Sequence, residues 1–126
     1  MSEIGTKVIW IIGGSGGIGS NLAKRMLDAG WKVIISARNQ ETLDLVSHGN
    51  SIESLIVDAT NAEQVQEKAK EINERYGSID AVVNSVGSIF LRPLHATSHD
   101  QFMETINQNL VTSFNVIRAT AKIMMR

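Results

Sequence analysis

A short apolar run, Val8–Ile12, leads without a break into a turn with five glycines, and a helical pattern begins within that turn. A strand without polar positions is typical of a parallel sheet that is covered on both faces. The first turn of a helix offers free N–H groups, and glycines let a phosphate approach the backbone closely. The stretch therefore predicts a parallel α/β fold and a phosphate-binding turn, although a tight strand-to-helix turn alone would also explain the glycines.

The glycines fit two spacings that predict different binding turns. Gly14, Gly16 and Gly19 match G-x-G-x-x-G, whereas Gly13, Gly17 and Gly19 match G-x-x-x-G-x-G. The P-loop of nucleoside triphosphatases is excluded, because a serine and no lysine follows the last glycine.

Strand-like and helix-like segments alternate along the chain. Strands are expected over residues 8–12, 31–37, 54–59 and 80–85, with helices over 17–29, 39–49 and 60–77 between them. Such alternation is typical of parallel strands joined by right-handed crossovers. We therefore predict a Rossmann-type, doubly wound α/β sheet of strand order 3-2-1-4 with helices on both faces. No linker or repeat divides the chain, so a single domain over residues 1–126 is expected.

Two further helices are expected after the fourth strand, over residues 98–109 and 110–126. Thr60 with Glu63, and Ser98 with Gln101, have the spacing of a capping box. The last helix is apolar on more than one side and should be covered on more than one side. One of its faces carries Leu110, Phe114, Ile117, Ala121 and Met124.

Composition limits the classes of partner and the compartment. A net charge of −1 argues against a nucleic acid or an anionic membrane held by bulk electrostatics. The chain has no cysteine and no apolar run of membrane-spanning length, which suits a cytoplasmic protein. Its three histidines are not in metal-ligand spacing, so no metal site is predicted.

The end of the second strand indicates the kind of dinucleotide. A dinucleotide-binding fold that prefers NAD(H) usually places an acid there, on the adenosine ribose. This chain has Ala37 and Arg38 instead. Because a guanidinium can bind a 2′-phosphate through two hydrogen bonds, we predict NADP(H) in preference to NAD(H).

These motifs together resemble the short-chain dehydrogenase/reductase family, classical type. "IGGSGGIG" resembles the family's T-G-x-x-x-G-x-G, which selects Gly13, Gly17 and Gly19 as the working spacing. "VDAT" resembles the aspartate after the third strand, and "NSVG" the N-N-A-G motif after the fourth. "INQNLVTSFNVIRA" resembles the segment with the active-site asparagine, which is Asn109 here.

The resemblance implies an oxidoreductase that transfers hydride between a nicotinamide and a small alcohol or carbonyl substrate. Asp58 would then hydrogen-bond the adenine edge. The implied cofactor-binding residues are Gly13, Ser15, Gly17, Ile18, Gly19, Arg38, Asp58, Ala59, Asn84, Val86 and Gly87.

Several positions depart from the family pattern. Ile12 lacks the hydroxyl that ties the first turn to the fourth strand, and Val86 adds bulk beside the cofactor ribose. Gly16 stands where many NADP-preferring relatives have a second basic residue. The family's catalytic serine and Tyr-x-x-x-Lys lie beyond the last helix, and the only tyrosine, Tyr76, is expected at the wrong edge of the sheet, as a packing residue.

We therefore expect a domain that is incomplete at its C-terminus and, as the 126-residue chain alone, inactive. The alternatives are a non-catalytic module that binds or senses NADP(H), or an assembly fragment. An open edge at the fourth strand beside an apolar helix invites pairing. The family's main subunit interface uses the helices equivalent to residues 98–107 and 110–125, so a homo-oligomer, a dimer or tetramer, is the expected partner arrangement.

Overall fold

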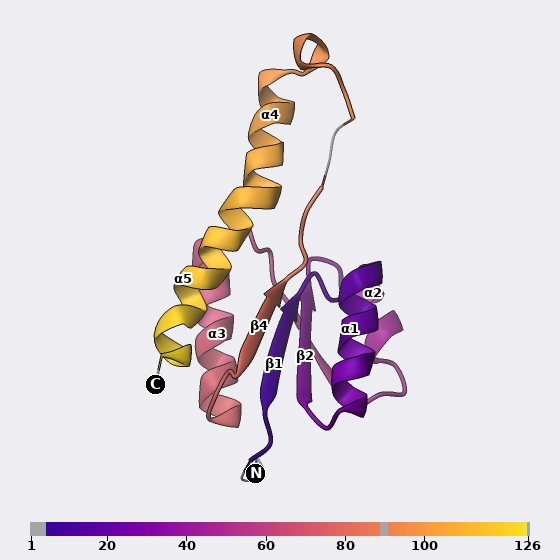
Figure 1. Cartoon of the computed structure of the whole chain (residues 1–126), viewed down its shortest axis with the longest axis vertical. Helices are drawn as coiled ribbons and strands as arrows, with labels where there is room; N and C mark the ends of the chain where they lie inside the picture. Colours follow the sequence, from indigo (N-terminus) through magenta and orange to yellow (C-terminus); the bar gives the residue numbers. More distant parts are fainter. Residues whose placement is uncertain (1–4, 89–90, 126) are drawn as a thin grey trace.

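The computed structural model describes residues 5–88 and 91–125, so both ends of the predicted single domain and residues 89–90 lie outside the described residues. Its centre is a parallel sheet in the order β3-β2-β1-β4 (Figure 1). The predicted sheet and its 3-2-1-4 order are confirmed. The strands are β1 (Val8–Ile12), β2 (Lys32–Ala37), β3 (Ile52–Ile56) and β4 (Ala81–Asn84).

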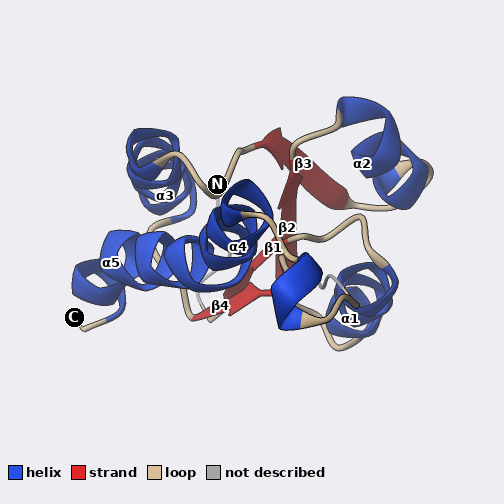
Figure 2. Ribbon diagram, turned by 90° about the horizontal axis from the view of Figure 1, so that it is seen from above, coloured by secondary structure: helices blue, strands red, loops and turns tan. Residues whose placement is uncertain are grey.

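Helices cover both faces of the sheet, which gives the predicted three layers (Figure 2). On one face lie α1 (Gly17–Asp28) and α2 (Gln40–Ser47), and on the other α3 (Ala62–Tyr76) and α5 (Thr112–Met124). Successive residues of a strand point to opposite faces, so β1 contributes to both cores. Ile9 and Ile11 pack toward α1 and α2, whereas Val8, Trp10 and Ile12 pack toward α3 and α5.

Trp10 is fully buried in the core between the sheet and helices α3 and α5. Its indole nitrogen Nε1 donates a hydrogen bond of 2.8 Å to Ser36 Oγ on the neighbouring strand β2. A buried indole N–H needs such a partner. This hydrogen bond joins the two central strands, β1 and β2, on the side of the sheet that faces α3.

The predicted capping box of α3 is wrong. Asn61, one residue later than Thr60, caps this helix, and its Oδ1 accepts a hydrogen bond of 3.1 Å from Gln64 N. Thr60 instead donates both its N–H and its hydroxyl to Asp58 Oδ1. The capping box of α4 (His99–Ile106) is confirmed, since Ser98 and Gln101 exchange side-chain and backbone hydrogen bonds.

The two helices expected after β4 form one continuous rod rather than separate elements. A π-helical turn, η2 (Asn107–Val111), joins α4 to α5 without leaving helical backbone geometry. No glycine or proline interrupts the sequence there, and the π turn absorbs the extra residue. As Figure 1 shows, α5 lies against the sheet layer while α4 projects beyond the carboxyl ends of the strands, and a short 3-10 turn, η1 (Leu94–Ala96), precedes it.

Helix α5 buries only one of its apolar sides. Val116 is buried, with Ala119 and Ile123 packed against the same core. On the other side, Phe114 and Ile117 are 62% and 64% exposed. The predicted face from Leu110 to Met124 is therefore the uncovered one in a single chain.

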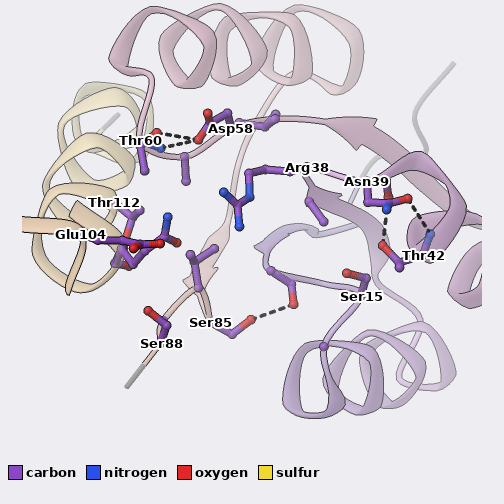
Figure 3. Close-up of a pocket in the computed structure, with 18 residues that line it drawn as sticks. Ser15, Arg38, Asn39, Thr42, Asp58, Thr60, Ser85, Ser88, Glu104 and Thr112 are labelled. Atoms are coloured by element: carbon purple, nitrogen blue, oxygen red, sulfur yellow. Dashed lines mark hydrogen bonds between the residues drawn. The ribbon is translucent and has the colours of Figure 1, made fainter. Parts of the chain in front are cut away.

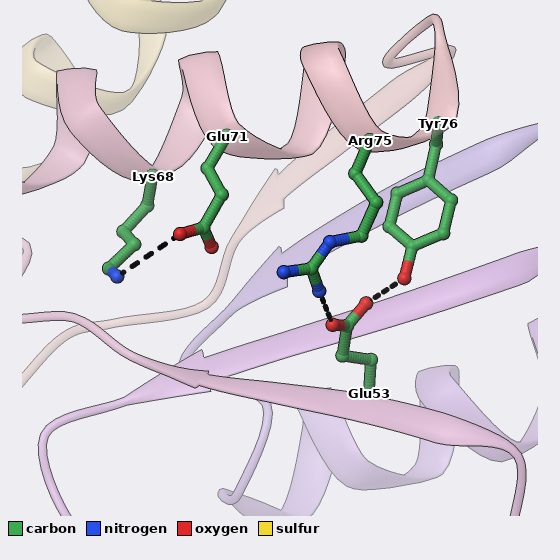
Figure 4. A network of polar contacts seen from close by, with 5 residues as sticks. All are labelled: Glu53, Lys68, Glu71, Arg75 and Tyr76. Carbon is green, nitrogen blue, oxygen red and sulfur yellow. Dashed lines mark hydrogen bonds and ion pairs between the residues drawn. The ribbon is translucent and has the colours of Figure 1, made fainter.

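A polar cluster joins the end of α3 to the edge strand β3 (Figure 4). Glu53 accepts hydrogen bonds from the hydroxyl of Tyr76 and from the Arg75 guanidinium. Partial burial, together with the Glu53 carboxylate, raises the pKa of Tyr76. The prediction of Tyr76 as a packing residue is incomplete, because its hydroxyl also binds the Glu53 carboxylate. Glu53 lies on an edge strand, where an inward-pointing charge discourages pairing with a further strand.

Candidate functional site

A cavity of about 380 Å³ opens at the carboxyl ends of the strands (Figure 3). In a doubly wound sheet this is the edge at which ligands bind. The walls come from the β1–α1 turn, the segments that follow β2, β3 and β4, and the α4–α5 rod. The predicted site residues that line it are Gly13, Ser15, Arg38, Asp58, Ala59, Val86 and Gly87.

The other predicted residues lie next to the cavity without lining it. Gly17, Ile18 and Gly19 form the first turn of α1, where the Ile18 side chain is exposed and Gly19 is buried. The side-chain amides of Asn84 and Asn109 are hydrogen-bonded to neighbouring protein groups. The structure therefore brings the strand-end residues together and places these five behind or beside them.

Three of the glycines are required by packing. Gly13 has a φ of 84°, and a Cβ there would lie 2.7 Å from Ser85 Oγ. A Cβ on Gly14 would lie 2.5 Å from Ile35 Cβ. A Cβ on Gly19 would collide with the carbonyl oxygen of Gly13. The glycines of both spacings thus include some that let the β1–α1 turn pack closely against β2, against the segment after β4 and against itself. Gly14 belongs to the spacing that the family resemblance did not select.

Gly16 and Gly17 have no comparable packing reason. Gly16 is the N-cap of α1 and offers no capping side chain, and the first turn carries no acidic residue. A Cβ on Gly17 would meet nothing within 4 Å. Within residues 5–88 and 91–125, the N–H groups of Gly17, Ile18 and Gly19 have no acceptor. The helix start therefore presents free donors and a positive dipole end to an open space, which suits an anion.

Ser85 supplies the tie that Ile12 cannot make. Its hydroxyl lies 2.9 Å from the carbonyl oxygen of Ile12 and 3.1 Å from that of Gly13, so its single proton serves one or the other. Figure 3 shows the second of these contacts. The contact with Ile12 spans 73 positions of the chain and joins the segment after β4 to the glycine turn. The family pattern predicts the loss of a hydroxyl at Ile12, but only the tertiary structure reveals its replacement by Ser85.

The segment after β2 places the positively charged side chain of Arg38 in the cavity. Figure 3 shows the guanidinium of Arg38 projecting into the space between the segments after β1 and β3. In the described part of the chain Arg38 has no salt-bridge partner. The next residue, Asn39, caps α2 by accepting hydrogen bonds from the backbone N–H groups of Glu41 and Thr42. Both Asn39 and Thr42 line the cavity, although the sequence had not suggested them.

The segment after β3 contributes one oxygen of the Asp58 carboxylate that is not engaged by the described part of the protein. Asp58 Oδ1 accepts from Thr60 N at 3.0 Å and from Thr60 Oγ1 at 2.6 Å. The backbone N–H of Asp58 donates to Gln64 Oε1. Among the described residues no group donates to Asp58 Oδ2, so this oxygen is available to a ligand that carries an N–H.

Two asparagines fasten the segment after β4 to the helical rod. Asn84 Nδ2 donates to the hydroxyls of Thr112 and Ser113, and its Oδ1 accepts from Val86 N. Asn109, in the π turn, donates 2.8 Å to Ser88 O and accepts 3.2 Å from Ser88 N. These bonds fix the backbone on which Val86 and Gly87 face the cavity.

This set of strand-end turns matches one known family over nearly the whole chain. The short chain dehydrogenase family matches residues 7–126. The chain belongs to that family. Membership relates it to oxidoreductases that use a nicotinamide cofactor.

Individual proteins similar to this chain agree with this assignment. An uncharacterised oxidoreductase of Staphylococcus aureus (strain MW2) is 28% identical over 128 residues, which cover 99% of this chain and 55% of that protein. The ligand-free aldohexose dehydrogenase of Thermoplasma acidophilum superposes with a TM-score of 0.86 at 27% identity, over 96% of this chain and 45% of that one.

A short chain dehydrogenase from Bacillus anthracis superposes with a TM-score of 0.87 at 28% identity, over 94% of this chain and 50% of that one. The chain thus spans about half the length of the relatives that it matches.

Among the described residues, no group of three or more acidic or histidine side chains is placed to hold a metal ion. None of the described helices is long and apolar enough to cross a membrane.

Proposed function

We propose that this chain is the nucleotide-binding part of an NADP(H)-dependent oxidoreductase that interconverts an alcohol and a carbonyl compound. One observation supports it most strongly: the N-cap of α1, Gly16, and the unpaired guanidinium of Arg38 line the same strand-end cavity, and the open first turn of the helix follows Gly16 directly. A dinucleotide with a 2′-phosphate has two anionic groups, and its pyrophosphate could bind at the helix start while its 2′-phosphate binds Arg38.

The groups at the cavity fit the parts of NADP(H) in order. The free N–H groups at the start of α1 would hold the pyrophosphate, and Arg38 the 2′-phosphate. Asp58 Oδ2 would accept from the exocyclic amine of adenine, beside Ala59. Val86 and Gly87 would face the ribose on the nicotinamide side. When bound, the nicotinamide ring would supply or accept the hydride, according to the direction of the reaction. The described residues would bind and orient the cofactor.

Asn109 is the residue that we propose this chain contributes to the active site. Its exposed amide is committed to Ser88 and to the carbonyl of Thr105, one helical turn earlier. We infer that it orders the backbone after β4 at the mouth of the cavity, where a small alcohol or carbonyl substrate would meet the nicotinamide.

A nucleotide titration tests the proposed cofactor. We expect NADPH to bind the chain about ten- to a hundredfold more tightly than NADH, since one charge-assisted pair contributes about 1.5–3 kcal/mol. Enhancement of NADPH fluorescence, checked by calorimetry, measures both dissociation constants. Equal affinities would remove the assigned preference, and no binding of either nucleotide would remove the proposed function.

We also propose that the rod of α4 and α5 joins copies of the chain. Phe102, Leu110, Phe114 and Ile117 expose at least half of their surface along it, and large exposed apolar areas mark interaction sites. The sheet edge at β4 pairs only with β1 in the described residues.

Sedimentation measures the expected assembly. The unsubstituted chain should exceed its monomer mass of 13.8 kDa, and Phe114→Glu should return it to that mass, because a buried unpaired carboxylate opposes association. Leu45→Glu, which replaces a leucine that is 82% exposed on α2, is the matched control and should leave the assembly intact. A monomeric unsubstituted chain would contradict this proposal.

A further inference from the structure

Asn115 is a buried polar residue that the cofactor pattern does not use. It lies on α5, is 6% exposed, and its Nδ2 donates a hydrogen bond of 2.9 Å to the carbonyl oxygen of Ala59. The two residues are 56 positions apart. By contrast, the hydroxyl of Thr120, which is also buried and lies five residues further along α5, donates within its own helix to Val116 O. Asn115 therefore reaches across to the segment that follows β3.

The carbonyl that Asn115 holds belongs to the same peptide unit as the N–H of Thr60. A peptide unit is planar and rigid, so fixing its oxygen also fixes its N–H. That N–H donates 3.0 Å to Asp58 Oδ1. A continuous chain of hydrogen bonds thus runs from Asn115 through the Ala59–Thr60 peptide to the Asp58 carboxylate, and hydrogen bonds in such a chain polarise one another.

The chain of bonds leaves one oxygen of the Asp58 carboxylate without a donor among the described residues. Asp58 Oδ1 is occupied by Thr60, and Oδ2 is not engaged by the described residues. Asp58, Ala59 and Thr60 line the cavity, whereas Asn115 does not. Asn115 can therefore affect a bound nucleotide only through this turn.

We infer that Asn115 is a positioning residue for adenine recognition: it sets the Ala59–Thr60 peptide, and through it the orientation of Asp58, without touching the nucleotide. The inference rests on the proposed function, because it assigns adenine to Asp58. It goes further in making base discrimination depend on a buried amide in α5.

The test compares NADPH with deamino-NADPH, in which hypoxanthine replaces adenine and a carbonyl oxygen replaces the exocyclic amine. The unsubstituted chain should prefer NADPH, because Asp58 accepts from the amine and repels the oxygen. In Asn115→Leu we expect NADPH affinity to fall about threefold to tenfold, the effect of losing one hydrogen bond. Deamino-NADPH affinity should hold within twofold, so the preference should shrink by the same factor.

Two further variants separate positioning from folding. Thr120→Val removes a buried hydrogen bond from the same helix but should leave the preference for adenine unchanged. Asn115→Ser keeps a small polar group that cannot reach Ala59, so it should show the same loss of preference as that expected for Asn115→Leu. It replaces the leucine variant in the test if that variant does not fold. Circular dichroism and the melting temperature report the folding of each variant.

The outcomes distinguish this inference from the proposed function. If the folded Asn115 variants keep the full preference for NADPH over deamino-NADPH, or if Thr120→Val loses it equally, the positioning role is overturned. If the unsubstituted chain binds NADPH without preferring it, the assignment of adenine to Asp58 fails while nucleotide binding stands. If it binds neither nucleotide, the proposed function and this inference fall together.

Discussion

Gly19→Ala is expected to lower the free energy of unfolding by about 1–3 kcal/mol, the usual cost of overpacking a filled site. The added methyl group would collide with the carbonyl oxygen of Gly13 and lie 2.9 Å from Gly14 Cα. Both obstacles are backbone, so no side chain can rotate away. The melting temperature should fall by roughly 4–12 °C, and NADPH affinity should drop with it, because the turn that holds the first anion must shift.

Gly17→Ala is the matched control, two residues earlier in the same helix. A Cβ there would meet nothing within 4 Å, and alanine is a better helix former than glycine by about 0.5–1 kcal/mol. The variant should be as stable as the unsubstituted chain or slightly more so. Its NADPH affinity should nevertheless fall about tenfold or more, a loss of about 1.4 kcal/mol, because the methyl group would occupy the space assigned to the pyrophosphate.

The two substitutions together locate the anion. A stable Gly17→Ala variant with unchanged NADPH affinity would place the pyrophosphate elsewhere. A Gly19→Ala variant as stable as the unsubstituted chain would show that the packing at the turn is not the reason for this glycine. Thermal unfolding and fluorescence titration of both variants measure the two effects separately.

The fold followed from local patterns because those patterns agree with one another. Uninterrupted apolar strands, each followed by an amphipathic helix, allow few arrangements besides a parallel sheet with covered faces. The errors occurred where two local signals competed. Thr60 and Asn61 can both cap a helix, and the choice of Asn61 depends on Asp58, which binds the Thr60 hydroxyl. The junction of α4 and α5 carries no breaker, so a π turn left no mark in the sequence.

The site was predictable as far as it depends on strand ends. Parallel strands bring their carboxyl ends to one edge, so Gly13, Arg38 and Asp58 could be placed together from the order of the elements alone. The contacts of Ser85 and Asn115 could not be predicted, because each joins positions far apart in the chain through a single side chain. Serine at a strand end or asparagine within a helix has many uses, and only the tertiary distance distinguishes them.

Arg38→Ala is expected to remove the preference for NADPH. Its guanidinium lies in the cavity and has no salt-bridge partner among the described residues. Because the 2′-phosphate would be its only ion partner, NADPH affinity should fall about ten- to a hundredfold, which corresponds to a charge-assisted pair of about 1.5–3 kcal/mol. NADH affinity should change less than about twofold, and the melting temperature should hold, since an exposed unpaired side chain contributes little to stability.

Bulk electrostatics would produce a different result, and Arg25→Ala distinguishes the two explanations. Arg25 is also exposed, but it lies in the last turn of α1, where its Nε donates to Asn21 Oδ1. Removing it changes the net charge by the same amount at the opposite end of that helix from the cavity. If both arginine variants weaken NADPH equally, the effect is long-range attraction of a polyanion, which salt screens. If only Arg38→Ala does, a direct contact with the 2′-phosphate explains the preference. In that case Arg38→Asp should reverse the preference, because a carboxylate repels the 2′-phosphate of NADPH and can accept from the free 2′-hydroxyl of NADH.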